Sequence, residues 1–322
     1  MSATPWLRAR VARKTMETES ICRLELVADG EQPLPPFTAG AHIDLRLPGG
    51  LVRQYSLSNA PADGGRYVLG VLREPASRGG SAAVHQALAE GTVVEISPPR
   101  NHFALAQGAE QHLLLAGGIG ITPLLSMAQH LAAEGQAFAL HYCTRSPAQT
   151  AFASLLAAAH LAPRVHHHFD DGDAAQKLDL TALLAQPRAG VHLYVCGPRG
   201  FMDWVLAAAR QAGWPEAQLH YEFFAGETVD LSDAGSFQVK LASSGRVIEV
   251  RPDQTVVQAL AACGVDVPVS CEQGVCGTCL TRVLEGTPDH KDLYLTEKEQ
   301  ALNDQFTPCC SRARTPLLVL DL

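Results

Sequence analysis

The cysteines near the end of the chain are the residues whose types and spacing most directly define a chemistry. Cys271, Cys276 and Cys279 follow the spacing C-x4-C-x2-C, and Cys309 comes after a further 29 residues. This is the plant-type spacing in which four thiolates hold one [2Fe–2S] cluster. Two glycines in the same loop leave its backbone free to approach the sulfurs closely. The sequence therefore predicts an electron-transfer cluster with these four cysteines as ligands.

Two alternatives bear on this prediction. Zinc also takes four thiolates, but zinc ribbons usually present two C-x2-C pairs, and here the first pair is C-x4-C. Cys310 competes with Cys309 as the fourth ligand, and the spacing favours Cys309. The chain has nine cysteines. An odd, clustered set in a chain with no export signal favours metal ligands over disulfides.

A second group of residues, in the first third of the chain, could bind a flavin. A flavin needs a hydrogen-bond partner near N5, an aromatic or apolar wall, and a cation for its phosphate. Ser56, Tyr55 and Arg53 supply these at the end of one predicted strand. A later R-G-G-S turn opens a predicted helix, and a helix N-terminus with a nearby arginine is an anion site. That turn consists of Arg78, Gly79, Gly80 and Ser81.

A third group could bind a nucleotide. The segment 117–123 reads G-G-I-G-I-T-P and joins a predicted strand to a predicted helix. Its glycines let the backbone close on a pyrophosphate, and Pro123 suits the start of a helix. A second turn, Cys196-Gly197-Pro198, closes a later strand. A glycine-rich turn alone could serve packing only, but together the two turns frame a crevice at the carboxyl ends of parallel strands.

The elements that must position these groups fall into successive regions. Region 1–108 has short alternating runs separated by turn residues, which predict an antiparallel β-barrel interrupted by one helix. Region 109–228 alternates apolar strands with alanine-rich helices, which predicts a parallel α/β sheet. A polar linker at 229–234 precedes region 235–322, which begins with a hairpin and a helix. The predicted strands are 21–27, 42–47, 66–72, 92–96, 112–116, 137–142, 165–169, 191–196, 237–241 and 247–250, and the predicted helices are 82–89, 123–133, 149–160, 201–212 and 255–262.

These motifs, in this order, resemble the phthalate dioxygenase reductase family, which includes the reductase subunits of vanillate demethylase-like Rieske oxygenases. The resemblance covers essentially the full chain. It implies an antiparallel flavin-binding β-barrel, a ferredoxin reductase-like parallel α/β NAD domain and a C-terminal plant-type [2Fe–2S] ferredoxin domain of the β-grasp type. It also implies FMN as the flavin.

The resemblance assigns roles to individual residues. Ser56, Cys196 and Phe224 are expected at the reacting ends of the flavin and the nicotinamide, with Cys196 packing rather than attacking. Phe224 and Glu222 match an E-x-F segment, and Phe223 leaves open which ring lies near the flavin. The expected flavin contacts are Arg53, Gln54, Tyr55, Ser56, Gly70, Val71, Arg78, Gly79, Gly80 and Ser81. The expected nucleotide contacts are Gly118, Gly120, Thr122, Pro123, Arg145, Asp170, Cys196, Gly197 and Pro198.

The charge pattern decides between related cofactors and excludes some function classes. Arg145 follows the second strand of the α/β region, but Asp170 and Asp171 follow the third, where they would repel a 2′-phosphate. NADH is therefore favoured over NADPH. The net charge of −8 without a Lys/Arg-rich run argues against nucleic-acid binding. The charge-free stretch 111–133 has glycines and a proline at its centre, which favours strand, turn and helix over a membrane span.

The sequence thus predicts a cytoplasmic reductase that passes electrons from NADH to FMN, to the cluster and on to a Rieske-type oxygenase partner. One alternative acceptor is a cytochrome-type monooxygenase or a separate ferredoxin. A further alternative, from another class, is a redox-sensing or binding module that carries the cofactors without turnover.

Overall fold

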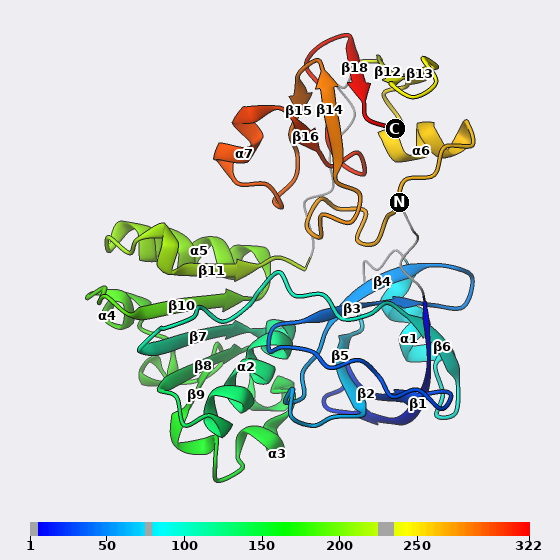
Figure 1. Ribbon diagram of the computed structural model, residues 1–322. Helices are drawn as coiled ribbons and strands as arrows, with labels where there is room; N and C mark the ends of the chain where they lie inside the picture. The colour runs from blue at the N-terminus through cyan, green and yellow to red at the C-terminus, as the bar shows by residue number, and fades with distance from the viewer. Residues whose placement is uncertain (1–5, 75–78, 225–234) are drawn as a thin grey trace. The chain divides into compact units, whose positions relative to one another are not determined.

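The computed structural model describes residues 6–74, 79–224 and 235–322. The chain divides into two compact units, Met1–Glu222 and Phe223–Leu322 (Figure 1). Each large sheet lies within one of the predicted regions, although the exact domain boundaries stay a prediction. The predicted linker 229–234 lies outside the described residues. No helix in the described ranges combines the length and the apolar character that crossing a membrane requires.

The first sheet is an antiparallel barrel with the strand order β4-β3-β6-β1-β2-β5. An isolated bridge between Leu57 and Leu69 joins its two ends, so that the sheet closes on itself. Alternating residues fill its interior, and Leu24 and Leu26 of β2 are fully buried. The elements are β1 (Leu7–Met16), β2 (Ile21–Ala28), β3 (His42–Arg46), β4 (Val52–Ser56), β5 (Arg66–Leu72), α1 (Gly80–Ala87) and β6 (Val93–Ile96).

The second sheet is parallel, with the order β11-β10-β7-β8-β9. The chain starts at β7 in the middle, runs outward through β8 and β9, and then returns to β10 on the other side of β7. The order in which strands are added to the sheet therefore reverses between β7 and β10, although the two strands are parallel. Such a topological switch point is where α/β sheets form their ligand crevice. The strands are β7 (Gln111–Gly117), β8 (Phe138–Thr144), β9 (Val165–Phe169), β10 (Val191–Cys196) and β11 (Leu219–Glu222).

One predicted helix of this region is wrong in length. The range 149–160 holds only α3 (Ala153–Leu156), between the 3-10 turns η2 (Pro147–Gln149) and η3 (Ala162–Arg164). Phe152 has φ 58°, a left-handed conformation that a regular helix cannot contain. The other helices are α2 (Ile121–Ala133), α4 (Leu180–Leu184) and α5 (Arg199–Gln211), with the 3-10 turns η1 (Gly118–Gly120), η4 (Ala174–Gln176) and η5 (Glu216–Gln218).

The second unit is a mixed sheet with the order β13-β12-β18-β14-β16 and a small β15-β17 pair. Its predicted hairpin is confirmed, because β12 and β13 pair over the predicted residues. The capping residue Thr255 starts α6, where its hydroxyl accepts a hydrogen bond from the backbone of Gln258. The elements are β12 (Phe237–Leu241), β13 (Val247–Val250), α6 (Val256–Ala262), β14 (Thr281–Glu285), β15 (Pro288–Asp289), α7 (Glu297–Leu302), β16 (Gln305–Phe306), β17 (Arg312–Ala313) and β18 (Leu317–Leu320).

Candidate functional site

The predicted cluster ligands converge in the second unit. Cys271, Cys276, Cys279 and Cys309 are all buried. The side chain of Cys271 interacts with those of Cys276 and Cys309, which lowers the pKa of the Cys271 thiol. Cys309 in turn contacts Cys271 and Cys279. The four thiols therefore form one connected group, although the last ligand is far from the others in sequence.

The arrangement of these thiols suits two irons better than one zinc. The thiols form a chain from Cys276 through Cys271 and Cys309 to Cys279. A [2Fe–2S] cluster uses four thiolates spread over two irons, whereas a structural zinc needs all four around one point.

The loop between the ligands is shaped for close approach. The backbone N–H of Gln273 lies 3.3 Å from Sγ of Cys271, as a donor that stabilises a thiolate must. Gly274 and Gly277 have φ values of 70° and 67°, which favour glycine. Cys310 contacts Cys309 and has its Sγ 3.2 Å from Oγ1 of Thr307. Cys309, by contrast, contacts both Cys271 and Cys279. The geometry therefore supports Cys309 as the fourth ligand.

In the first unit, the register of β3 and β4 assigns the flavin-strand residues to two faces. Ser56 pairs with His42, whereas Tyr55 pairs with the fully buried Ile43. Directly paired residues of antiparallel strands point to the same face. Arg53 and Tyr55 therefore share one face, and Ser56 lies on the other. Burial raises the pKa of the Tyr55 hydroxyl, which keeps this ring neutral as a wall beside a cofactor.

The start of α1 lies against Arg53. A Cβ atom on Gly80 would come within 2.7 Å of Cγ and Nε of Arg53, so any larger residue there would displace the arginine side chain. Gly79 precedes the helix with φ 90°, and Oγ of Ser81 accepts a hydrogen bond from the backbone of Glu74 at 3.1 Å. A guanidinium group beside a helix N-terminus fits the phosphate of a flavin. Arg78 lies outside the described residues.

The remaining predicted flavin contacts are placed less directly. Gln54 lies on the face of Ser56, and its Nε2 is 3.5 Å from Oδ1 of Asp44. The side chain of Val71 belongs to the barrel core, so only its backbone could meet a ligand. A Cβ on Gly70 would lie 2.7 Å from Cγ2 of Thr122. Gly70 therefore allows the barrel to pack on the α/β sheet, a role that the sequence did not reveal.

The glycine-rich turn lies at the switch point. A Cβ on Gly120 would overlap the carbonyl oxygen of Cys196 and lie 2.5 Å from the nitrogen of Gly197. The two predicted turns therefore touch, and packing alone requires glycine at position 120. Gly118 differs, because its φ is 51° and no atom lies within 4 Å of its Cβ direction. Position 118 thus leaves room for a ligand to approach the backbone.

The neighbours of these glycines complete the crevice. Thr122 is buried, and its Oγ1 donates to the carbonyl of Ile119 at 3.1 Å. Pro123 lies in the first turn of α2, where a missing N–H costs nothing. Burial and then the charge of Glu222 raise the pKa of the Cys196 thiol well above its ordinary value. A protonated, fully buried Cys196 is a packing residue rather than a nucleophile.

The outer residues of the predicted nucleotide site are exposed. Pro198 precedes α5 and accepts the backbone N–H of Met202 at 3.0 Å. Arg145 follows β8 and Asp170 follows β9, both at the carboxyl edge of the sheet. The backbone N–H of Asp170 donates to the carbonyl of Thr144 at 3.1 Å, which fixes the acidic turn beside the end of β8.

One group at the crevice was incompletely predicted. Oγ of Ser56 donates to Oε2 of Glu222 at 3.3 Å, and Nδ1 of His42 lies 3.6 Å from Oε1 of the same carboxylate. The sequence analysis did not single out His42. The strand β3 is buried on both faces, so a polar residue within it, such as His42, is a signal that could have indicated a functional role. Phe224 belongs to the second unit and is 37% exposed, so its predicted role stays a prediction.

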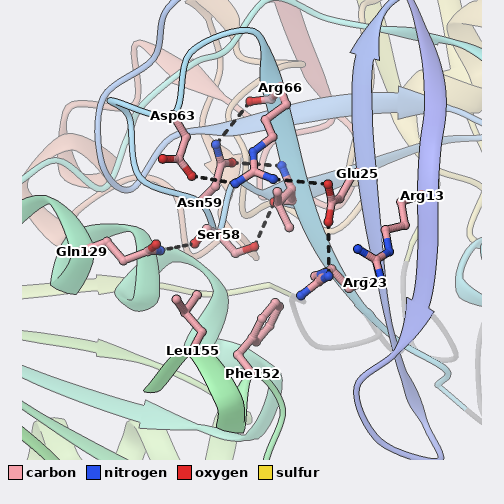
Figure 2. A pocket seen from close by; sticks show the side chains of 11 residues that line it. Arg13, Arg23, Glu25, Ser58, Asn59, Asp63, Arg66, Gln129, Phe152 and Leu155 are labelled. Carbon is pink, nitrogen blue, oxygen red and sulfur yellow. Dashed lines mark hydrogen bonds and ion pairs between the residues drawn. The ribbon is translucent and has the colours of Figure 1, made fainter. Parts of the chain in front are cut away.

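A pocket of about 320 Å³ lies elsewhere in the first unit (Figure 2). It is lined by residues of the barrel, α2 and the α3 region, none of which is a predicted cofactor contact. Its charges largely pair with one another, since Arg23 and Arg66 contact Glu25 at 3.2 and 3.3 Å. The guanidinium groups of Arg23 and Arg66 are therefore already engaged within the pocket.

Known families match two parts of the chain. The family described as 2Fe-2S iron-sulfur cluster binding domain matches residues 239–314, which include all four predicted ligands. The family described as dimethylamine monooxygenase subunit DmmA-like, N-terminal domain, matches residues 93–219. The first range contains the cluster loop, and the second contains β7, β8, β9 and β10 of the parallel sheet.

Known proteins match almost the whole chain. The vanillate O-demethylase oxidoreductase of Pseudomonas sp. (strain HR199 / DSM 7063) is 54% identical over 312 residues, 97% of this chain and 98% of that protein. The phthalate dioxygenase reductase of Burkholderia cepacia is 38% identical, over 98% of both chains. A solved structure of phthalate dioxygenase reductase superposes with a TM-score of 0.77 at 38% identity, again over 98% of both chains.

The fold and the site define an oxidoreductase with a flavin barrel, a pyridine-nucleotide sheet and an iron–sulfur domain on one chain. The chain belongs to the phthalate dioxygenase reductase family. This membership confirms the predicted fold class and supports the predicted cofactors, FMN, NADH and a [2Fe–2S] cluster.

Proposed function

We propose that this chain is the NADH-dependent reductase component of a two-component Rieske aromatic oxygenase, either a dioxygenase or an O-demethylase. Its product is a supply of single electrons for the oxygenase. The observation that carries the proposal is the near full-length match to proteins named as vanillate O-demethylase oxidoreductase and phthalate dioxygenase reductase.

When bound, FMN accepts a pair of electrons from NADH and the cluster carries them singly to the partner. The chain's own residues bind and orient these groups. Arg53 and the start of α1 would hold the flavin phosphate, and Ser56 would face the flavin edge. The open backbone at Gly118 would meet the nucleotide. Cys196 fills the crevice without a charge.

The preference for NADH over NADPH rests on the exposed acidic turn after β9. Asp170 lies at the carboxyl edge where the ribose end of a nucleotide would bind, beside the single Arg145. A carboxylate there accepts hydrogen bonds from a 2′-hydroxyl and repels a 2′-phosphate.

A second candidate acceptor has its own observation. The structure of an intact type IV self-sufficient cytochrome P450 monooxygenase superposes with a TM-score of 0.85 at 38% identity. The match covers 98% of this chain but only 41% of that chain. A separate cytochrome-type monooxygenase is therefore the alternative partner.

We place the protein in the cytoplasm. All nine cysteines are free thiols in the structure, including five that lie outside the ligand set. A reducing compartment keeps such thiols from oxidising, and it also supplies NADH.

The test is an anaerobic titration of the purified protein with NADH, followed by visible absorption and low-temperature EPR. Bleaching of the flavin together with the signal of one reduced [2Fe–2S] cluster is the expected result. Release of the flavin and chromatography then distinguish FMN from FAD. Flavin bleaching with no cluster signal, and zinc or no iron by metal analysis, would leave a simple flavin reductase instead.

The partner is tested by supplying purified acceptors to the NADH-reduced protein. We expect rapid reduction of a Rieske oxygenase component and slow reduction of a cytochrome P450 or a free ferredoxin. A Cys309→Ser variant is the matched control, because it should still reduce its flavin but pass no electrons to the oxygenase. The opposite order of acceptor rates would favour the cytochrome partner.

A further inference from the structure

The side chain of His42 is buried, although its imidazole ring is polar. It is 2% exposed, and neither of its ring nitrogens has a hydrogen-bond partner. A buried imidazole without partners costs free energy, because the lost hydrogen bonds to water are not replaced. Such a residue needs a compensating interaction close by.

The carboxylate of Glu222 lies beside His42. Nδ1 of His42 lies 3.6 Å from Oε1 of that carboxylate, while Oε2 accepts the hydroxyl of Ser56 at 3.3 Å. The sheet register explains why both residues reach the same group. His42 and Ser56 are direct cross-strand partners of β3 and β4, so their side chains point to the same face.

Other charged groups face this cluster but are already engaged. Asp44, two residues from His42 on the same face of β3, forms an ion pair with Arg100. The ring of His102 lies 5.6 Å from that of His42, and burial lowers the pKa of His102. Its lowered pKa favours a neutral ring at neutral pH. Because Asp44 pairs with Arg100, Glu222 is the carboxylate of this group that interacts with His42.

We propose that His42 is a positioning residue that holds the Glu222 carboxylate in place for its hydrogen bond with Ser56. The polar edge of the imidazole, with Nδ1 3.6 Å from Oε1, restricts the carboxylate plane, so that Oε2 stays aimed at the serine hydroxyl. This inference rests on the proposed function, because it takes the crevice beside Ser56 as the flavin site.

The consequence is a fixed direction for the serine hydroxyl. An ionised carboxylate can only accept hydrogen bonds, so Ser56 must donate its hydrogen to Glu222. The lone pairs of Oγ are then left for a donor in the crevice. A flavin carries an N–H at N5 only in its reduced form, so the arrangement of His42, Glu222 and Ser56 favours binding of reduced over oxidised flavin.

The test is the midpoint potential of the bound flavin in the full chain. His42→Phe should lower the ratio of reduced to oxidised flavin at a fixed potential by about tenfold, the low end of the range for one hydrogen bond to a charged group. For a two-electron couple, tenfold corresponds to about 30 mV. His42→Gln should keep the potential close to that of the wild type, because its amide N–H presents a similar polar edge to Oε1.

Two further variants separate positioning from a structural role. His112 is equally buried, at 1% exposure, but lies at the amino end of β7, away from the crevice. His112→Phe should therefore leave the potential unchanged even if it lowers stability. In a Glu222→Gln background, His42→Phe should cause no additional shift, because the carboxylate that it positions is gone.

The outcomes are distinguishable. A wild-type protein that binds no flavin, or whose flavin NADH does not reduce, contradicts the proposed function itself. A wild-type protein that works as proposed, with His42→Phe at the same potential, overturns the role of His42. An equal shift with and without Glu222 would also overturn it, since the effect would not pass through the carboxylate. Flavin content and thermal midpoints of each variant verify folding.

Discussion

Gly277 in the cluster loop gives a prediction that can be worked out from the structure. Its φ of 67° is left-handed, and a Cβ atom there would overlap the ring of Tyr294, with Cε1 at 2.7 Å and Cζ closer still. A left-handed conformation costs an L-residue about 1–2 kcal/mol, and overpacking costs about 1–3 kcal/mol. Gly277→Ala should therefore cost about 2–5 kcal/mol.

The cost should be visible as faster loss of the cluster. Cluster release requires the loop to open, and its rate follows the population of the opened state when reclosing is fast. At about 1.4 kcal/mol per factor of ten, Gly277→Ala should release the cluster roughly 30- to 4,000-fold faster. The assay is the decay of the cluster's visible absorption in the full-length protein at a fixed urea concentration.

Two comparisons separate the strain from the clash. Gly264→Ala in the same unit meets the same left-handed requirement, with φ 76°, but no atom lies within 4 Å of its Cβ. Gly264→Ala should therefore cost only the strain of the left-handed backbone, about 1–2 kcal/mol. In a Tyr294→Ala background, Gly277→Ala should also cost only about 1–2 kcal/mol. If Gly277→Ala costs the same with and without the Tyr294 ring, the steric part of the reasoning is refuted.

Three further predictions concern the ligands, pH and the nucleotide. Cys309→Ser should abolish the cluster, measured as iron content and EPR, whereas Cys310→Ser should keep it. Burial lowers the pKa of His141 and of His220 to about 4 in the folded protein. Because the unfolded chain then binds more protons than the folded one, the free energy of unfolding should fall as the pH drops from about 6.5 to about 4. The loss is at most about 1.4 kcal/mol per pH unit for each proton. Urea unfolding followed by circular dichroism at several pH values measures this. Asp170→Ser should reduce the preference for NADH over NADPH in steady-state kcat/KM by about tenfold, the effect of one hydrogen bond to a charged group.

Each of these has an outcome that contradicts it. A cluster retained in the Cys309 variant and lost in the Cys310 variant would exchange their roles. Urea midpoints that stay constant or rise as the pH falls would show that the two buried histidines do not control acid stability. An unchanged cofactor preference in the Asp170 variant would place the ribose away from the turn after β9.

The sequence predicts well whatever depends on local spacing. The plant-type cysteine pattern identifies the cluster loop, and the hairpin over β12 and β13 is confirmed at both strands. The alternation of apolar strands and helices correctly indicates the parallel sheet, because a strand–helix period is a property of neighbouring residues. The order of the motifs was enough to indicate the family.

Local sequence patterns mispredict an element when a single backbone angle or a partner strand far away in the sequence determines its structure. The range 149–160 has a helical composition, yet the left-handed Phe152 reduces it to the short α3. The strand β1 was not predicted, although it pairs with both β2 and β6 in the barrel. Its charged residues alternate with Ala9 and Val11, so the apolar signal over Leu7–Met16 is weak.

By itself, the sequence determined the modules, their cofactors and the class of reaction, since those follow from residue types at fixed spacings. Only the tertiary structure showed that Gly120 must be glycine to let the turn after β7 touch the end of β10. Only the structure brought His42 and Ser56 to Glu222, a residue 166 positions away from the serine. The pairing of strands across a closed barrel and a parallel sheet creates that group, and no spacing along the chain can encode a contact between elements that meet only after both have folded.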